Sequence, residues 1–400
     1  MTGSPRKYPN PMESPGQLLE LIRTSDGVTR SDLVEITGLA RSTVTQRVDL
    51  LLAHDLVHEA GEAPSTGGRP PSIIRFNGEA GVVLVADLGA THARFAVTTL
   101  DAAVLAESGI DMLISDGPDV VLDMTLKTFE TLLQESGVAD SRVRGIGIGV
   151  PGPINFAVGR PSDPPIMPGW HDYPIGDRFA ERFGVPVLVD NDVNIMALGE
   201  FWSTDPRPAD MIFIKVGTGI GCGLIVDGHL HRGARGAAGD VGHIRIGDSQ
   251  ANCRCGNTGC LEAIAGGGAL AAQLSEAGYD TKNSRDVVNL AGTGNAEAVA
   301  ALREAGRKIG GMLAGVVNLL NPSVVVIGGD VAQAGQALLA GIREAIYRRS
   351  TTLNTSELQI RGSELGDRAG IIGAVALVIE RILDPSVVDE AIQTNVGAVA

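Results

Sequence analysis

Apolar positions in the first 60 residues recur at the spacing of three short helices. Ser14 stands before Pro15, with Gln17 three residues after it, and a serine cap, an early proline and such a glutamine are start signals of a helix. Residues 29–32, Thr-Arg-Ser-Asp, repeat the capping pattern before a second apolar segment that ends at Gly38. A third segment, over residues 40–52, places three apolar side chains on one face: Val44, Val48 and Leu51. Three short helices with a glycine-containing turn before the third predict a helix-turn-helix.

The segment after the third helix predicts a β-hairpin. Residues 56–59 and 72–76 are typical of strands, and they flank a Gly- and Pro-rich loop at residues 61–71. A helix-turn-helix followed by a hairpin is a winged helix, which we place at residues 14–78. The Pro- and Asn-rich residues 1–13 before it are expected to be disordered. A small helical dimerisation module, which uses the same apolar periodicity, is the alternative.

The exposed face of the third helix favours DNA binding. Hydroxyl, amide and guanidinium groups contact phosphates and read base edges, and this face carries one acid, Asp49, at its far end. The candidate DNA-binding residues of this helix are Arg41, Ser42, Thr45, Gln46 and Arg47. In the hairpin loop, Arg69 stands between Gly68 and Pro70, and such a narrow segment suits a DNA minor groove. A stiff linker to the next domain is the alternative for that loop.

From residue 81 the pattern changes to buried strands that alternate with helices. We expect strands at 81–87, 94–98, 145–150, 185–189 and 323–327, helices at 118–136, 193–201 and 370–382, and a second glycine-rich hairpin at 211–226. Polar residues stand at the strand ends, and the two similar hairpins indicate a duplicated α/β architecture. We assign residues 79–192 to a first lobe, joined by a C-terminal helix over 370–390, and residues 193–369 to a second lobe.

Glycine turns after buried strands mark a candidate phosphate site. In the first turn, Asp87 and Thr91 flank Gly89, and such a carboxylate can hold Mg²⁺ beside a phosphate. A second turn offers backbone N–H groups at Gly217, Thr218, Gly219 and Gly221. The pair Gly328 and Gly329 follows a further buried strand and is expected to lie under a nucleotide base. Each turn alone could be an ordinary glycine turn, but the three in this order indicate ATP binding.

The most specific pattern is a histidine followed by three cysteines. His243 precedes Cys253, Cys255 and Cys260, and one imidazole with three thiolates matches a closed tetrahedral Zn²⁺ site. Three unrelated cysteines near a histidine are the alternative. Cys222 stands alone in a strand and is expected to be a core residue. The sequence therefore predicts one structural zinc ion per chain.

Composition narrows the class of protein. With 400 residues, 44% apolar and 20% charged, the chain is not disordered throughout. It contains no apolar run of about 18 residues and no apolar N-terminal segment, and its four cysteines are too few for a disulfide scaffold. We therefore expect a cytoplasmic protein, associated with the nucleoid when DNA-bound. Most of the net charge of −15 lies after residue 80, since residues 1–80 carry 8 Lys and Arg against 10 Asp and Glu.

Together these motifs resemble those of the ROK family of repressors, open reading frames and sugar kinases. The resemblance rests on Gly-His-x9-Cys-x-Cys-Gly with Gly-Cys-Leu-Glu (residues 242–262), on residues 87–94 and on residues 189–194. More narrowly, the chain resembles the winged-helix ROK regulators of actinobacteria. The resemblance implies an actin-like, ribonuclease-H-like fold of two lobes, with a sugar site in the cleft between them.

The resemblance also implies roles for cleft residues. Asp192 matches the catalytic base of the kinases, which takes a proton from a sugar hydroxyl, although it could also cap the helix that begins at Val193. The implied sugar-binding set is Gly152, Asn191, Asp192, Asp240, His243 and Glu262. Two positions depart from the kinases: Asp240 stands where they usually have Glu, and Ile166 where they often have Asn. Both changes weaken the geometry for phosphoryl transfer.

The first hypothesis is therefore a sugar-responsive, DNA-binding transcriptional regulator of carbohydrate metabolism, a repressor. Its expected partners are operator DNA, a sugar effector and further copies of itself in a homodimer or homotetramer, with no membrane association. Zinc is the expected cofactor, and Mg²⁺ and ATP are further candidates. An ATP-dependent sugar kinase with a DNA-binding head is the second hypothesis. A zinc-stabilised sugar-binding protein without DNA function is the third.

Overall fold

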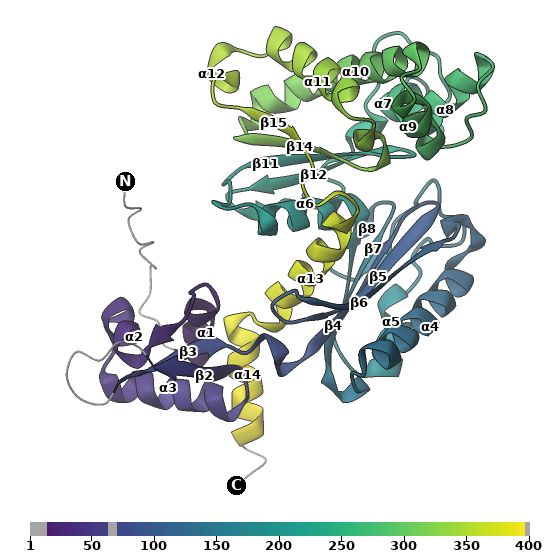
Figure 1. The fold of residues 1–400 in the computed structure, drawn as a ribbon. Coiled ribbons are helices and arrows are strands. Elements are labelled where there is room, and N and C mark those ends of the chain that lie inside the picture. The colour runs from purple at the N-terminus through teal and green to yellow at the C-terminus, as the bar shows by residue number, and fades with distance from the viewer. Residues whose placement is uncertain (1–13, 63–69, 397–400) are drawn as a thin grey trace.

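A computed structural model describes residues 14–62 and 70–396, with side chains to residue 394. Its N-terminal part, here called the head, contains three helices and a three-stranded sheet of order β1-β3-β2 (Figure 1). The head elements are α1 (Pro15–Arg23), β1 (Val28–Thr29), α2 (Arg30–Thr37), α3 (Arg41–Ala53), β2 (Val57–Glu62) and β3 (Ser72–Phe76). Both predicted capping boxes are present, at Ser14 with Gln17 and at Thr29 with Asp32. The predicted hairpin loop, including Arg69, lies largely outside the described residues.

The first lobe is a five-stranded sheet of order β10-β7-β4-β5-β6, in which β4, β7 and β10 run parallel. Its strands are β4 (Val82–Leu88), β5 (His92–Thr99), β6 (Val104–Asp111), β7 (Val143–Val150) and β10 (Val187–Asn191), and its helices are α4 (Pro118–Ser136) and α5 (Ile175–Phe183). A short hairpin, β8 (Ile154–Asn155) with β9 (Arg160–Pro161), stands beside it. Alternate residues of β4 pack toward opposite faces, Leu84 with α4 and α5 and Val83 with the C-terminal helix α13 (Ala369–Ile382).

The second lobe repeats this plan with a sheet of order β13-β12-β11-β14-β15. Its strands are β11 (Met211–Val216), β12 (Ile220–Val226), β13 (His229–Leu230), β14 (Val324–Gly328) and β15 (Gln359–Gly362). Its helices are α7 (Leu261–Ala265), α8 (Gly267–Glu276), α9 (Ser284–Gly292), α10 (Ala296–Leu320), α11 (Gln336–Arg349) and α12 (Thr352–Thr355). Each lobe opens with an antiparallel hairpin, β4–β5 or β11–β12, whose first strand also pairs in parallel with a later strand. This repeat confirms the predicted α/β architecture.

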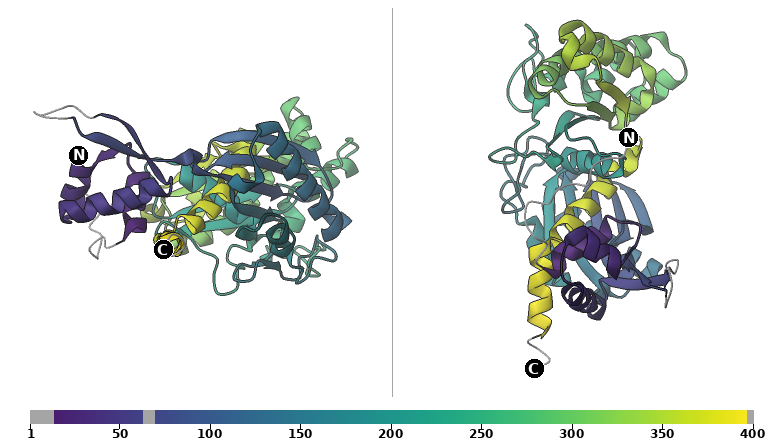
Figure 2. Two further views of the ribbon diagram at one scale, coloured as in Figure 1. Left: turned by 90° about the horizontal axis from the view of Figure 1, so that it is seen from below. Right: turned by 90° about the vertical axis from the view of Figure 1, so that its left-hand side faces the viewer.

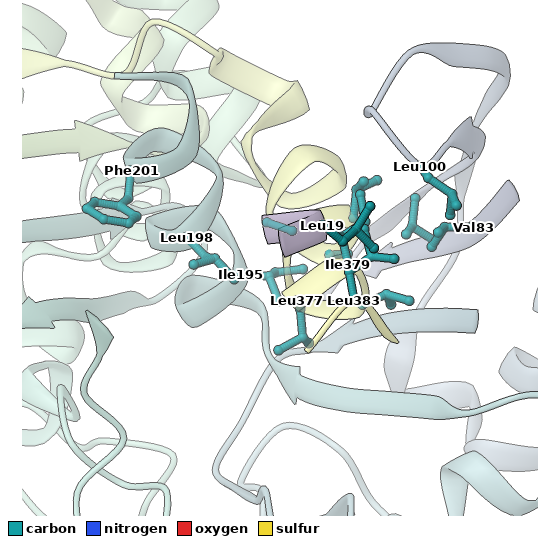
Figure 3. Close-up of a cluster of buried hydrophobic side chains, with 14 of the residues drawn as sticks. Leu19, Val83, Leu100, Ile195, Leu198, Phe201, Leu377, Ile379 and Leu383 are labelled. Carbon is teal, nitrogen blue, oxygen red and sulfur yellow. The ribbon is translucent and has the colours of Figure 1, made fainter. Parts of the chain in front are cut away.

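Two helices pack on each other between the lobes. α6 (Asp192–Ser203) covers one face of the second sheet, and α13 covers the first sheet and packs along α6. Figure 3 shows Ile195 and Leu198 of α6 and Leu377 and Ile379 of α13 among the buried apolar side chains of this layer. Leu19 of α1 belongs to the same cluster, so the core of the head is continuous with the core between the lobes.

The prediction of one C-terminal helix over residues 370–390 is wrong. The chain forms two helices, α13 and α14 (Pro385–Val396), because Pro385 cannot continue a helix but is well suited to start one. α14 packs against α1 of the head (Figures 1 and 2). The Gly16 amide donates to Asp389 Oδ1 at 2.8 Å, and a Cβ at Gly16 would lie 2.3 Å from the Pro385 carbonyl oxygen. The C-terminus therefore ties the lobes to the head.

Within the described ranges, 14–62 and 70–396, no helix is both long enough and apolar enough to cross a membrane.

Candidate functional site

A cleft of about 460 Å³ lies between the lobes, where β4, β7 and β10 end in parallel at one edge of the first sheet. Ligand sites of α/β proteins commonly lie at such carboxyl ends. The wall from the second lobe is formed by the β11–β12 turn and by the segment around Asp240 and His243. Seven acidic residues line the cleft: Asp87, Asp163, Asp192, Asp240, Glu262, Asp330 and Asp367. Arg94 and Lys215 are the Arg and Lys residues in the same lining.

The predicted sugar-binding residues all line this cleft. Asn191 is the N-cap of α6, and its Oδ1 accepts from the Val193 amide at 3.0 Å. Its Nδ2 donates to the Gly152 carbonyl at 2.8 Å and so joins the Pro-Gly-Pro loop to the start of α6. Asp192 Oδ1 also accepts a hydrogen bond from the Val193 amide, at 2.7 Å, whereas Asp192 Oδ2 faces Lys215. Asn191 and Asp192 thus both bind the Val193 amide in the first turn of α6, and both line the cleft.

An ion pair behind the cleft, which the sequence analysis missed, fixes one of its loops. Asp190 is buried, and its Oδ2 accepts from Arg232 Nε at 2.7 Å, while its Oδ1 accepts from Asn194 Nδ2 at 2.9 Å. The Arg232 guanidinium also lies over the Phe156 ring, 3.7 Å from its centroid. Because Arg232 precedes residues 236–240, this ion pair positions a segment that lines the cleft.

Lys215 is the second residue that the sequence analysis missed. Its Nζ lies 2.5 Å from Asp192 Oδ2, and the side chain is 24% exposed. Burial lowers the pKa of Lys215, but the carboxylates of Asp192 and Asp87 outweigh that effect, so its pKa lies above the ordinary value. The available signal was a lysine within the otherwise apolar strand 211–216, one residue before the glycine turn.

Asp87, the predicted magnesium ligand, is held at the end of β4. Burial raises the pKa of Asp87 to about 6, although the positive charge of Lys215 opposes the shift. Its Oδ1 is buried and makes no hydrogen bond to a described residue. A Cβ at Gly370 would lie 2.0 Å from its Oδ2, so this glycine of α13 permits the close approach.

Of the eight other predicted phosphate-site residues, seven line the cleft and one does not. Gly89, Thr91, Gly217, Thr218, Gly219, Gly221 and Gly329 line the cleft together with Asp87. Gly328 is not among the lining residues: a Cβ there would lie 2.4 Å from Cζ of Phe213, inside the second sheet. Gly328 therefore serves close packing, and only Gly329 of the pair reaches the cavity.

Two residues of the predicted metal cluster, His243 and Cys255, line the cleft. Each of His243, Cys253, Cys255 and Cys260 offers one donor atom, and these atoms lie within 4.8 Å of one another. Cys253 Sγ is 3.5 Å from His243 Nδ1, and Cys255 Sγ is 3.7 Å from Cys260 Sγ. Soft thiolates with one imidazole at these separations fit a tetrahedral zinc ion.

The cluster shapes two candidate sugar contacts. His243 Nε2 points away from the sulfurs, 3.9 Å from Asp240 Oδ1. Cys260 is the N-cap residue of α7, and Glu262 in the first turn of this helix accepts a hydrogen bond from the Ile220 amide at 3.1 Å.

The thiols of the cluster have shifted pKa values. A hydrogen bond from the Asn257 backbone amide lowers the pKa of Cys255 to about 7, whereas burial raises the pKa of Cys260 to about 12. Metal binding must therefore release protons from thiols at neutral pH.

On the head, five of the six predicted DNA-binding residues lie on the third helix, and the sixth, Arg69, lies outside the described residues. Arg41, Ser42, Thr45 and Gln46 surround one shallow depression on α3, and Arg47 is half-buried on the same helix. Arg30 of α2 pairs with Asp49 at 3.0 Å and with Glu59 at 3.1 Å. One guanidinium thus faces two carboxylates, so the negative charge of Asp49 at the far end of α3 is only partly offset.

Comparison with known proteins identifies the family. Residues 83–381 match the ROK family model, and the chain belongs to the ROK family. The xylose repressor of Caldicellulosiruptor bescii is 31% identical over 380 residues, which cover 92% of this chain and 95% of the repressor. A crystal structure of a ROK family transcriptional regulator, a homologue of the Escherichia coli MLC protein, superposes with a TM-score of 0.81 and 27% identity, covering 95% of this chain and 98% of that one.

Similarity to kinases covers less of the chain. A ROK family glucokinase from Streptomyces griseus, solved in complex with glucose and AMPPNP, gives a TM-score of 0.66 at 28% identity. The match covers 74% of this chain and 99% of the kinase. The fold is thus a winged helix-turn-helix head followed by a two-lobed kinase-like domain.

Proposed function

We infer that this protein is a sugar-responsive, DNA-binding transcriptional repressor of carbohydrate metabolism. The observation that carries the inference is one continuous apolar core, which joins the head to the helices beside the cleft. The similarity to a xylose repressor over 92% of the chain supports the same function. Titration of operator DNA with and without candidate sugars tests it, since a regulator must change its affinity for DNA when the sugar binds.

The head binds operator DNA through α3, as a homodimer or homotetramer that presents two recognition helices to a two-fold site. Replacing both Arg41 and Gln46 with Ala should weaken operator binding by about 100-fold, since each base or phosphate contact contributes ~1–3 kcal/mol. Fluorescence anisotropy at fixed salt measures the effect. Arg348→Ala, at an exposed arginine on α11, is the matched control and should bind as the parent does. If the double variant bound operator DNA as tightly as the parent does, the DNA contact would not lie on this face of α3.

The cleft binds a sugar through Gly152, Asn191, Asp192, Asp240, His243 and Glu262. In this proposal a zinc ion is held by His243, Cys253, Cys255 and Cys260, and its role is structural. With Nδ1 facing the sulfurs, the Nε2 edge of His243 is left for a sugar hydroxyl. The metal therefore fixes the orientation of a ring that contacts the ligand.

The sugar signal reaches the head through α6. This helix begins with Asp192 at the cleft and carries Trp202 near its other end. Trp202 Nε1 donates to Glu380 Oε1 of α13 at 2.9 Å, and the Arg23 guanidinium of α1 lies 5.8 Å from the centre of the Trp202 rings. A shift of α6 at its start would be transmitted directly to the first helix of the head.

Sugar phosphorylation is the alternative function, favoured by the similarity to glucokinases. We expect no turnover at ordinary kinase rates of ~1–100 per second, since small displacements of reacting groups cost ~100-fold in rate. Ile166 lines the cleft without offering a hydrogen bond, and Asp240 reaches toward His243. A coupled assay for ADP release, run with hexoses, pentoses and amino sugars, distinguishes a kinase from a sugar-binding regulator. Turnover that disappears in Asp192→Ala would establish a kinase.

A further inference from the structure

Lys215 occupies the corner of the cleft at which the two lobes bring their carboxylates together. On β11, the side chains of Phe213 and Lys215 point to the face covered by α6, whereas Ile214 packs into the core on the other face. At the end of the strand this geometry directs Lys215 to the start of α6. There its Nζ meets Asp192 Oδ2 at 2.5 Å.

The surroundings hold Lys215 as an ammonium ion. Asp192 is 8% exposed and Lys215 24% exposed, so solvent screens their pair only weakly. Asp87 and Asp330 add negative potential at the same place. Asp87 keeps one buried oxygen that has no partner among the described residues. One fixed positive charge thus faces three carboxylates from both lobes.

These residues do not fit Mg²⁺ with ATP. Magnesium requires oxygen ligands at about 2.0–2.1 Å in an octahedral arrangement, supplied by one or two carboxylates and by phosphates. Here the ammonium ion of Lys215 already takes Asp192 Oδ2, and it would repel a divalent ion beside Asp87. A metal-bound phosphate could enter only if this side chain left its position.

We propose that Lys215 is a built-in counter-ion that replaces the divalent metal, so that the cleft takes an uncharged sugar without Mg²⁺ or nucleotide. The choice of an uncharged sugar follows from the lining, in which seven acidic residues face Arg94 and Lys215. A phosphorylated sugar would bring its charge against that excess. The proposal rests on the proposed function, because it assumes that the cleft is the sugar site.

The test measures binding of Mn²⁺, as a paramagnetic substitute for Mg²⁺, together with AMPPNP to the zinc-loaded full chain. Electron paramagnetic resonance counts bound Mn²⁺ directly. The parent protein should bind the pair at least ~100-fold more weakly than Lys215→Thr, since one unit charge at close range is removed. Lys215→Met, which keeps the apolar stem, should gain the same binding. Lys282→Thr, at a lysine that is 79% exposed, is the matched control and should behave like the parent.

Three results would overturn the proposal. One is tight Mn²⁺ and AMPPNP binding by the parent, a measurement that depends on no variant. The second is the absence of any gain in both Lys215 variants, and the third concerns the sugar. Sugar affinity of the parent, measured by calorimetry with and without added Mg²⁺, should be the same within twofold, and a requirement for Mg²⁺ would also overturn it. If no sugar binds at all, the proposed function fails while the Mn²⁺ measurement still reports on Lys215.

Discussion

Replacing Cys260 with Ala should remove the bound metal and the response to sugar. Cys260 is 1% exposed, contributes one of four clustered donor atoms and directly precedes the helix that carries Glu262. With three ligands left, the closed tetrahedral site is lost, and so is the loop that orients His243. We expect zinc content to fall from one ion per chain to nearly none, and sugar affinity to fall by about 100-fold. Elemental analysis and calorimetry measure the two effects.

Cys222→Ala is the control for this prediction. Cys222 is also buried, but it lies on β12 outside the cluster, so this variant should keep its zinc. Zinc retained in Cys260→Ala together with a normal sugar response would contradict the prediction. Parent protein that contains no zinc when purified without chelators would show that the cluster is not a zinc site.

Local signals made the fold predictable. Ser14 and Thr29 cap their helices through contacts three residues away, so the sequence contains the whole interaction. The nearly continuous apolar run of β4 likewise indicates burial on both faces of a sheet. The metal ligands were predictable because three of them lie within eight residues. In each case the interacting residues are close along the chain, or the apolar pattern continues over a whole strand, so the sequence alone contains the signal.

The missed features are pairs between distant segments. Lys215 meets Asp192, and Arg232 meets Asp190, and nothing near either basic residue indicates its acid. The contact of α14 with α1 joins the two ends of the described chain, so only the folded structure reveals it. Gly328 shows the converse error, because a glycine next to a functional turn was interpreted as functional although it serves packing against Phe213.

Replacing Trp202 with Ala should separate sugar binding from DNA release. α6 is 12 residues long, about 18 Å at the usual rise, and spans from the cleft to the head. Trp202 contacts Glu380 of α13 and Arg23 of α1, and Arg207 lies over the same ring system at 5.4 Å. Truncation removes these contacts while leaving the start of α6 intact. Sugar affinity should therefore stay within about threefold of the parent value.

The sugar-induced change in operator affinity should be lost in Trp202→Ala. Coupling between two sites usually amounts to ~1–3 kcal/mol, or about 5–150-fold, and it requires an element that differs between the two states. Anisotropy titrations of operator DNA, with and without saturating sugar, measure the ratio directly. The matched control is Phe183→Ala, since Arg182 lies over the Phe183 ring at 4.7 Å in a similar contact at the end of α5, which belongs to the first lobe. That variant should respond as the parent does. A full response in Trp202→Ala would mean that the signal travels through α13 and α14 without the tryptophan.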